Sequence, residues 1–287
     1  MQNILVPTDF SPEAHNAFEV AMQLAHRTHG QITLLHVVDA SAGSGMVTTG
    51  GVSSGASLHG VFMVELLQRT KHRMRQLIAE MARIAPEVTV HDQVATGNVD
   101  EAILEVIREQ HMDLVVIGAQ VHAPAFLHLF ELDSHAERLV RLAPCPVLTV
   151  KLPAPHFEVR SIVFASDFSQ EADRAVKSLK QVCAAFPEAT LHLLDVVTRA
   201  EDYSNAIDRI NAFADRHHIL NFEPDVVNAP QVSIGVPRYA EQSHADLVVM
   251  LSHGRTGLWH FLHGGSTAES VAVQAKAPVL TFHPETF

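Results

Sequence analysis

DLVVMLSHGRTGLWHFLHGGSTAE, residues 246–269, reads as a buried strand that runs into a glycine-rich turn and then into a helix. Gly254 and Gly257 lie in the turn, and Gly264 and Gly265 lead to Ser266 at the start of the helix. Glycines let the backbone approach a ligand closely, and a helix N-terminus attracts negative charge. The stretch therefore predicts a site for an anionic ligand.

The same stretch occurs earlier in altered form. Residues 113–137 read DLVVIGAQVHAPAFLHLFELDSHAE, so the strand, the long loop and the Ser-x-Ala-Glu helix start all recur. The glycines do not recur, and Glu131 and Asp133 add negative charge where a phosphate would sit. We expect the ligand in the second copy and a degraded site in the first.

Composition limits the possible functions. The chain has 287 residues, 47% hydrophobic and 18% charged, which is long enough for two globular domains. A formal charge of −12 favours neither nucleic acid nor an anionic membrane surface as a partner. The start MQNILVPTDF resembles a strand rather than a signal peptide, and no uncharged apolar run reaches about 18 residues, so a cytoplasmic location is expected.

Strands and helices alternate twice along the chain. The KLPAPHF linker, residues 151–157, separates the repeats, and the alternation predicts parallel sheets covered on both faces. The expected fold class is α/β, with two tandem five-stranded domains over residues 1–152 and 158–287. Expected strands are 4–6, 32–38, 87–94, 113–118, 144–150, 162–165 and 190–197, and expected helices are 12–30, 61–84, a helix that opens at Gly97, 135–141 and 169–186.

Two segments carry specific expectations. Residues 40–60 are small and polar and predict a mobile loop, whose absence from the second repeat chiefly explains why that repeat is shorter. Residues 228–245 contain Pro230, Gly235 and Pro237 and predict a short or kinked helix.

Histidine is abundant, with 20 residues. The long loops hold two groups of three, but no pair has the i, i+4 helical spacing with a glutamate that is typical of zinc hydrolases. No metal site is expected, although zinc binding by a His-rich loop remains an alternative. The groups are His122, His128 and His135, and His253, His260 and His263.

Taken in order, these motifs resemble the universal stress protein family as a tandem pair. The resemblance is carried by VPTDFS at residues 6–11, LLHVV at 34–38, DLVVI and DLVVM before the long loops, SHGRTG at 252–257 and PCPVLTV at 144–150. It implies a Rossmann-like fold of the adenine nucleotide alpha hydrolase type. It also implies ATP bound by a Gly-x2-Gly-x9-Gly-Ser/Thr loop, with AMP or ADP as alternative nucleotides and Mg²⁺ as a companion ion.

The resemblance also implies roles for individual residues of the second copy. Asp167 would contact the adenosine, with the alternative that it only caps its own turn, and Arg255 would be a charge partner or a solvated loop residue. Leu251 departs from the pattern because it replaces the first glycine, and one residue is inserted before Gly265 and Ser266. The implied nucleotide-binding set is Ala165, Ser166, Asp167, Val196, Met250, His253, Gly254, Arg255, Gly264, Gly265, Ser266 and Thr267.

Three function classes remain open. The first is a nucleotide-binding stress regulator without turnover, in which the C-terminal domain binds the nucleotide, the last strands 147–150 and 279–282 pair the two domains, and a homodimer can form. The second is a slow ATPase or phosphotransferase, although no GxxxxGK[ST] motif occurs and no catalytic residue is assigned. The third is a scaffold that binds a different ligand or zinc.

Overall fold

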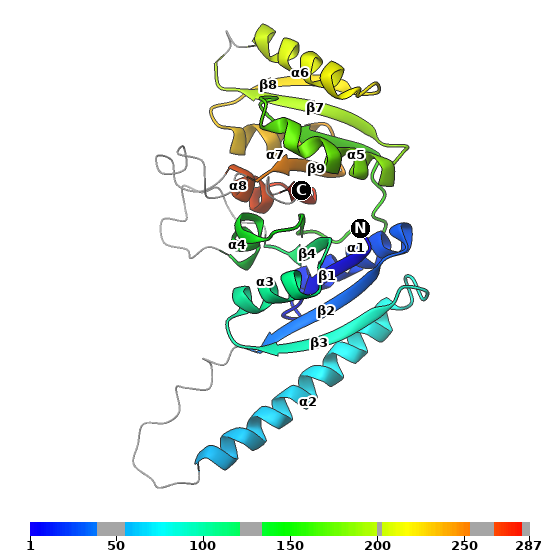
Figure 1. Ribbon diagram of the computed structural model, residues 1–287, viewed down its shortest axis with the longest axis vertical. Coiled ribbons are helices and arrows are strands. Elements are labelled where there is room, and N and C mark those ends of the chain that lie inside the picture. Colours follow the sequence, from blue (N-terminus) through cyan, green and yellow to red (C-terminus); the bar gives the residue numbers. More distant parts are fainter. Residues whose placement is uncertain (39–54, 121–133, 200–202, 253–266, 283–287) are drawn as a thin grey trace.

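The protein forms one ten-stranded sheet. The structure, a computed structural model, describes residues 1–38, 55–120, 134–199, 203–252 and 267–282, with only the backbone of 55–62. The strand order is β3-β2-β1-β4-β5-β10-β9-β6-β7-β8, so each half of the chain contributes five adjacent strands. Figure 1 shows the strands following one another along the long axis, from β3 beside α2 to β8 beside α6. The α/β fold class is confirmed.

The first half alternates strand and helix as expected. Its elements are β1 (Asn3–Pro7), α1 (Pro12–Thr28), β2 (Gln31–Val38), α2 (Gly55–Met81), β3 (Val90–Thr96), α3 (Val99–Glu109), β4 (Leu114–Gly118), α4 (His135–Leu142) and β5 (Val147–Val150). All strand pairs within this half are parallel.

The second half repeats this order. Its elements are β6 (Ser161–Ala165), the 3-10 helix η3 (Ala172–Ala175), α5 (Val176–Ala185), β7 (Thr190–Val197), α6 (Tyr203–His217), β8 (Glu223–Asn228), α7 (Val232–Gln242), β9 (Leu247–Leu251), α8 (Thr267–Gln274) and β10 (Val279–Phe282). Its strand pairs are also parallel.

Helices cover both faces of the sheet. Side chains from α1, α2, α5 and α6 pack with one set of strand residues into one core, whereas α3, α4, α7 and α8 pack on the other face. The strands at the centre of each half, including β1, β4, β6 and β9, are almost wholly apolar and buried, as parallel strands covered on both sides must be. Within the described residues, no helix is both long enough and apolar enough to cross a membrane.

The two halves meet where β5 and β10 pair antiparallel. Leu148 lies opposite Leu280, and the pairs on either side are related by an approximate twofold axis. The hydroxyl group of Thr281 donates to the Val147 carbonyl group at 3.2 Å, and that of Thr149 donates to the Ala272 carbonyl group at 3.1 Å. Arg141 on α4 lies 3.4 Å from Glu269 on α8, so polar contacts also link the helices across the join.

The helix that follows the first strand differs between the halves. In the first half, Ser11 caps α1 by accepting a hydrogen bond from the Ala14 N–H group at 3.2 Å, with Pro12 at the first helical position. In the second half, the expected helix 169–186 is wrong at its start. A 3-10 turn occupies Ala172–Ala175 and the α-helix begins only at Val176, without a side-chain cap.

The last residue of the neighbouring strand explains this difference. Gly118 ends β4 so close to α1 that a Cβ atom there would lie 2.4 Å from the Glu13 carbonyl carbon. The corresponding residue at the end of β9 is Leu251, a partly buried side chain that packs against the core. An α-helix that began as early as α1 does would leave no room for this side chain, so the looser 3-10 start accommodates it.

Three other expectations need correction. Helix α2 begins at Gly55 and ends at Met81, so the expected loop 40–60 is partly helical, and its remainder, 40–54, lies outside the described residues. Helix α2 has 27 residues and α6 has 15, so the helix as well as the loop shortens the second half. Helix α7 has 11 residues, as α3 does, so the expectation of a short helix is wrong, whereas a kink at Pro237 stays a prediction.

The side chain of Lys151, directly after β5, is buried without a partner. The residue is 4% exposed, and its Nζ atom has no hydrogen-bond partner in the described part of the chain. Burial lowers the pKa of this ammonium group from 10.5 to about 7. Because a charge in an apolar environment costs free energy, Lys151 opposes folding whenever it is protonated.

We expect that enlarging the last residue of β4 and shortening the last residue of β9 will each destabilise the protein. Gly118→Ala should lower the free energy of unfolding by about 1–3 kcal/mol, because the added carbon meets the α1 backbone. Leu251→Ala should also destabilise, by about 1–2 kcal/mol, because it removes a packed side chain. Urea unfolding measures both values, and a neutral Gly118→Ala would contradict the close approach.

The Lys151→Met variant should be more stable than the parent protein at neutral pH. The pKa of Lys151 is about 7 in the folded state and 10.5 in the unfolded state, so the unfolded state binds more protons between these values and parental stability rises with pH. The gain in the free energy of unfolding, relative to the parent protein, should be about 4 kcal/mol at pH 7 and vanish near pH 10.5. Urea unfolding at several pH values measures it, and a pH-independent difference would contradict the burial of an unpaired amine.

Candidate functional site

A cavity opens at the carboxyl ends of the strands in the second half, where the strand order changes direction. The chain passes from β6 to β7 on one side and from β8 to β9 on the other, and ligands of open α/β sheets bind in such crevices. The cavity has a volume of about 200 Å³. It is lined by Ala165, Ser166, Asp167, Glu171, Ala172, Leu194, Asp195, Val196, Val232, Met250, Leu251, Thr267 and Ala268.

The turn after β6 holds the first polar side chains of this cavity. The Ser169 N–H group donates to Asp167 Oδ1 at 3.0 Å, and the Phe168 N–H group donates to the hydroxyl of Ser166 at 3.1 Å. Phe168 adopts a left-handed backbone conformation with φ of 53°, which is uncommon for a residue with a side chain. Asp167 itself remains exposed, so one of its oxygens closes the turn while the side chain faces the cavity.

The walls of the cavity are largely apolar. Val196, near the end of β7, and Met250, on β9, each contribute an apolar side chain from the strands on either side of β6. Helix α7 approaches β7 very closely, since a Cβ atom at Gly235 would lie 2.5 Å from Val196 Cγ1. This close contact holds Val196 in position, so Gly235 is a packing requirement of the site.

Carboxylates supply the charge at the cavity. Asp195 is 4% exposed and pairs with Arg209 of α6, whose Nη2 lies 2.6 Å from Asp195 Oδ2. Asp167 and Glu171 also line the cavity. A phosphate inside the cavity would therefore be repelled, whereas hydroxyl groups could donate to these oxygens.

Half of the residues implied by the resemblance lie together here. Ala165, Ser166, Asp167, Val196, Met250 and Thr267 all line the cavity. The other six, His253, Gly254, Arg255, Gly264, Gly265 and Ser266, lie outside the described residues. Sequence reasoning did not include Asp195, Glu171 or Val232; the position of Asp195 directly before Val196 at the end of a strand was the available signal for it.

A cavity of similar size, about 190 Å³, occupies the corresponding place in the first half. Its turn is built in the same way, because the Ser11 N–H group donates to Asp9 Oδ1 at 2.9 Å and Phe10 has a φ of 64°. Burial by itself would raise the pKa of Asp9, but the hydrogen bonds from Ser11 hold it below its usual value. His36 replaces Asp195 and donates from Nδ1 to the Thr8 carbonyl group at 2.7 Å.

The start of α4, beside this first cavity, is occupied by the protein's own side chains. Ser134 and Glu137 form a capping box, in which each side chain accepts a hydrogen bond from the other residue's backbone N–H group. The Asp100 carboxylate, 4% exposed, lies 2.7 Å from His135 and 2.9 Å from Arg138. Anionic groups of the chain thus fill the place where a phosphate would meet a helix N-terminus. In α7 the residue that corresponds to Asp100 is Ser233.

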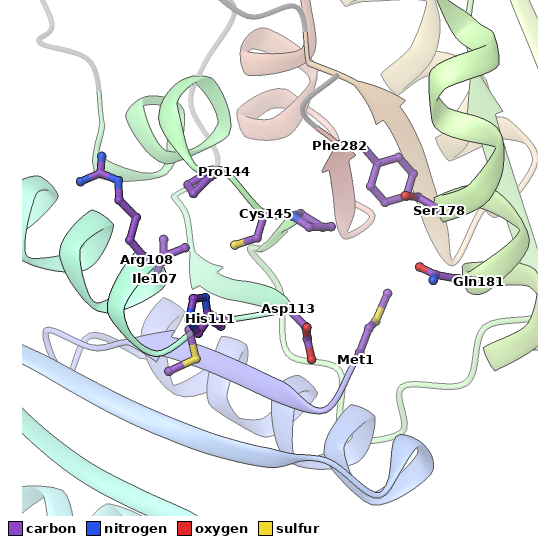
Figure 2. A pocket seen from close by; sticks show the side chains of 12 residues that line it. Met1, Ile107, Arg108, His111, Asp113, Pro144, Cys145, Ser178, Gln181 and Phe282 are labelled. Atoms are coloured by element: carbon purple, nitrogen blue, oxygen red, sulfur yellow. The ribbon is translucent and has the colours of Figure 1, made fainter. Parts of the chain in front are cut away.

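Figure 2 shows a further cavity, of about 550 Å³, away from the strand ends described above. Arg108 and His111 lie at one side of it, and Ser178 and Gln181 lie at the other, on α5. Cys145 also lines it, and burial raises the pKa of its thiol to about 12, so this cysteine is not a reactive thiolate. Phe282, the last described residue, borders the same cavity, and the chain continues beyond it outside the described residues.

Comparison with known proteins gives consistent results over the whole chain. The model of the universal stress protein family matches residues 1–151 and 222–283. Universal stress protein Slr1230 of Synechocystis sp. is 24% identical over 292 residues, which cover 98% of this chain and 100% of the relative.

Solved structures show the same fold. A universal stress protein from Archaeoglobus fulgidus superposes with a TM-score of 0.69 at 19% identity, with 98% of each chain covered. A putative universal stress protein from Pseudomonas aeruginosa gives 0.62 at 19% identity and covers 99% of this chain and 94% of that one. Since the family model matches well over half of the residues, and since the turns, strand order and cavities agree with a tandem arrangement, the chain belongs to the universal stress protein family.

Proposed function

We propose that this protein binds ATP through its second half and acts as a nucleotide-dependent stress regulator without appreciable turnover. The observation that carries the proposal is the cavity at the strand ends of β6, β7 and β9, which combines apolar walls with carboxylates at a topological switch point. In this reading the halves have different tasks: the second binds the ligand and the first completes the sheet.

The size of the cavity selects the part of the ligand that enters it. Sites that enclose a whole drug-sized ligand have volumes of about 300–1,000 Å³, whereas this cavity has about 200 Å³. A planar adenine fits between apolar side chains such as Val196 and Met250, because burial of its faces removes apolar surface from water. The triphosphate would remain outside, away from the carboxylates.

The polar groups at the rim suit the ribose and the phosphates in turn. Asp167 and Ser166 present oxygen atoms that can accept hydrogen bonds from ribose hydroxyl groups. Thr267 opens α8 at the same rim, and the N–H groups and dipole of a helix start favour phosphate oxygens. A Mg²⁺ ion bound to the phosphates would reduce their repulsion from Asp167 and Glu171. The glycine-rich residues 254–265 would complete this phosphate site.

The first half is the weaker candidate for nucleotide. The capping box at Ser134 and the Asp100 carboxylate, which pairs with His135 and Arg138, already occupy the start of α4 without any ligand. Pairing of β5 with β10 covers one edge of each half, so the first half serves as a built-in partner. A homodimer would therefore have to use a different surface from these last strands.

Calorimetric titration of the nucleotide-stripped protein with ATP and Mg²⁺ tests the proposal. We expect one binding event per chain. Asp167→Asn should weaken it by about 10- to 100-fold, since a hydrogen bond to a charged group contributes about 1.5–3 kcal/mol. Asp9→Asn is the matched control, because the two aspartates close equivalent turns and an asparagine oxygen can keep that hydrogen bond.

The control decides which half binds. Loss of affinity in Asp9→Asn with no loss in Asp167→Asn would move the site to the first half and contradict the proposal. No binding in the parent protein would contradict it outright. ATP turnover faster than about 1 per second would contradict the regulator without turnover and favour an enzyme.

A further inference from the structure

Three potential metal ligands meet on the two outermost strands of the second half. His192 is the third residue of β7, and Glu223 and Asp225 are the first and third residues of β8. The strands pair in register with His192 opposite Glu223, so the three side chains lie on one face of the sheet. Figure 1 shows β8 as the outermost strand at this end of the sheet. The site lies away from the proposed nucleotide cavity, since Val196 is four residues, or roughly 13 Å, further along β7.

The distances are close to those of a metal site. The Nδ1 atom of His192 lies 3.0 Å from Asp225 Oδ2 and 3.5 Å from Glu223 Oε2, and all three ligand atoms lie within 4.8 Å of one another. Ligand atoms around a tetrahedral zinc ion, each at about 2.1 Å from it, are separated by about 3.4 Å. A small closure of the exposed Glu223 side chain would bring the set to this geometry.

The charge balance distinguishes this cluster from an ordinary ion pair. Elsewhere a His–Asp pair is accompanied by an arginine: Arg138 binds Asp100 beside His135, and Arg216 binds Asp173 beside His217. At His192 two carboxylates face one imidazole, and neither forms an ion pair with a lysine or arginine in the described part of the chain. One Nδ1 proton can satisfy only one of these oxygens, so a divalent cation would balance the charge better.

Tyr239 on α7 provides the outer support. Its hydroxyl group lies 3.2 Å from His192 Nδ1 and is close to Asp225. Such a donor orients a ligating carboxylate, as the outer hydrogen-bond partners of metal ligands generally do.

We propose that His192 Nδ1 and the carboxylates of Glu223 and Asp225 bind one divalent transition-metal ion of the zinc type, with water completing its coordination. The imidazole nitrogen and carboxylate oxygens suit this class of ion. Because the ligands come from both β7 and β8, the ion would tie the edge strand to its neighbour and stabilise the end of the sheet.

Titration with Zn²⁺ in a non-coordinating buffer tests the site in the full chain. The variant Glu223→Gln removes a ligand from an exposed side chain, so it should leave the fold intact. We expect Glu223→Gln to abolish the binding of one zinc ion per chain, or to lower the affinity of that binding event more than 100-fold. Tyr239→Phe should weaken the same event by roughly 10-fold, through loss of an outer hydrogen bond. Asp173→Asn is the matched control, since Asp173 pairs with both a histidine and an arginine, and its zinc isotherm should equal that of the parent protein.

Thermal unfolding gives an independent readout. Zn²⁺ should raise the unfolding midpoint of the parent protein and of Asp173→Asn, and raise it less for Glu223→Gln, because only a site in the folded state stabilises it. Identical zinc isotherms for Glu223→Gln and the parent protein would overturn the proposal, because any binding would then belong to other histidines. Absence of zinc binding at micromolar concentrations would also overturn it.

Discussion

The structure depends on the antiparallel pairing of β5 with β10. Two five-stranded sheets each leave an open edge at their last strand, and this pairing covers both edges at once. The buried hydroxyl groups of Thr149 and Thr281 bind carbonyl groups there, so the join carries few unsatisfied polar atoms. Because β5 and β10 run antiparallel, an approximate twofold axis relates the two halves at this pairing.

The two halves share the β5–β10 pairing and the same order of elements, yet the residues around their cavities differ. Both keep the turn in which an aspartate accepts from a serine N–H group and a phenylalanine is left-handed. They differ around that turn: Gly118 permits an early α1, whereas Leu251 accompanies a 3-10 start. They also differ at the neighbouring helices, where Asp100 in α3 is replaced by Ser233 in α7.

Much of this organisation could be predicted from the sequence, because alternating apolar strands and amphipathic helices have strong local signals. The bounds of β7 agree exactly with expectation, and six residues expected near one ligand do share a cavity. The expected helix start at residue 169 was wrong because the residue that accounts for the later start, Leu251, lies about 80 residues further along the chain. The ligand cluster of His192, Glu223 and Asp225 was missed for a similar reason: it depends on strand register, which leaves no fixed spacing in the sequence.

Photoaffinity labelling with 8-azido-ATP most directly tests the central claim, that the adenine enters the cavity of the second half. After irradiation and digestion, mass spectrometry identifies the labelled peptides. The account predicts label on peptides that contain the lining residues 165–167, 171–172, 194–196 or 250–251 of that cavity, and its loss when excess ATP competes. Competable label within residues 7–14 or 35–37, which line the equivalent cavity of the first half, would contradict it.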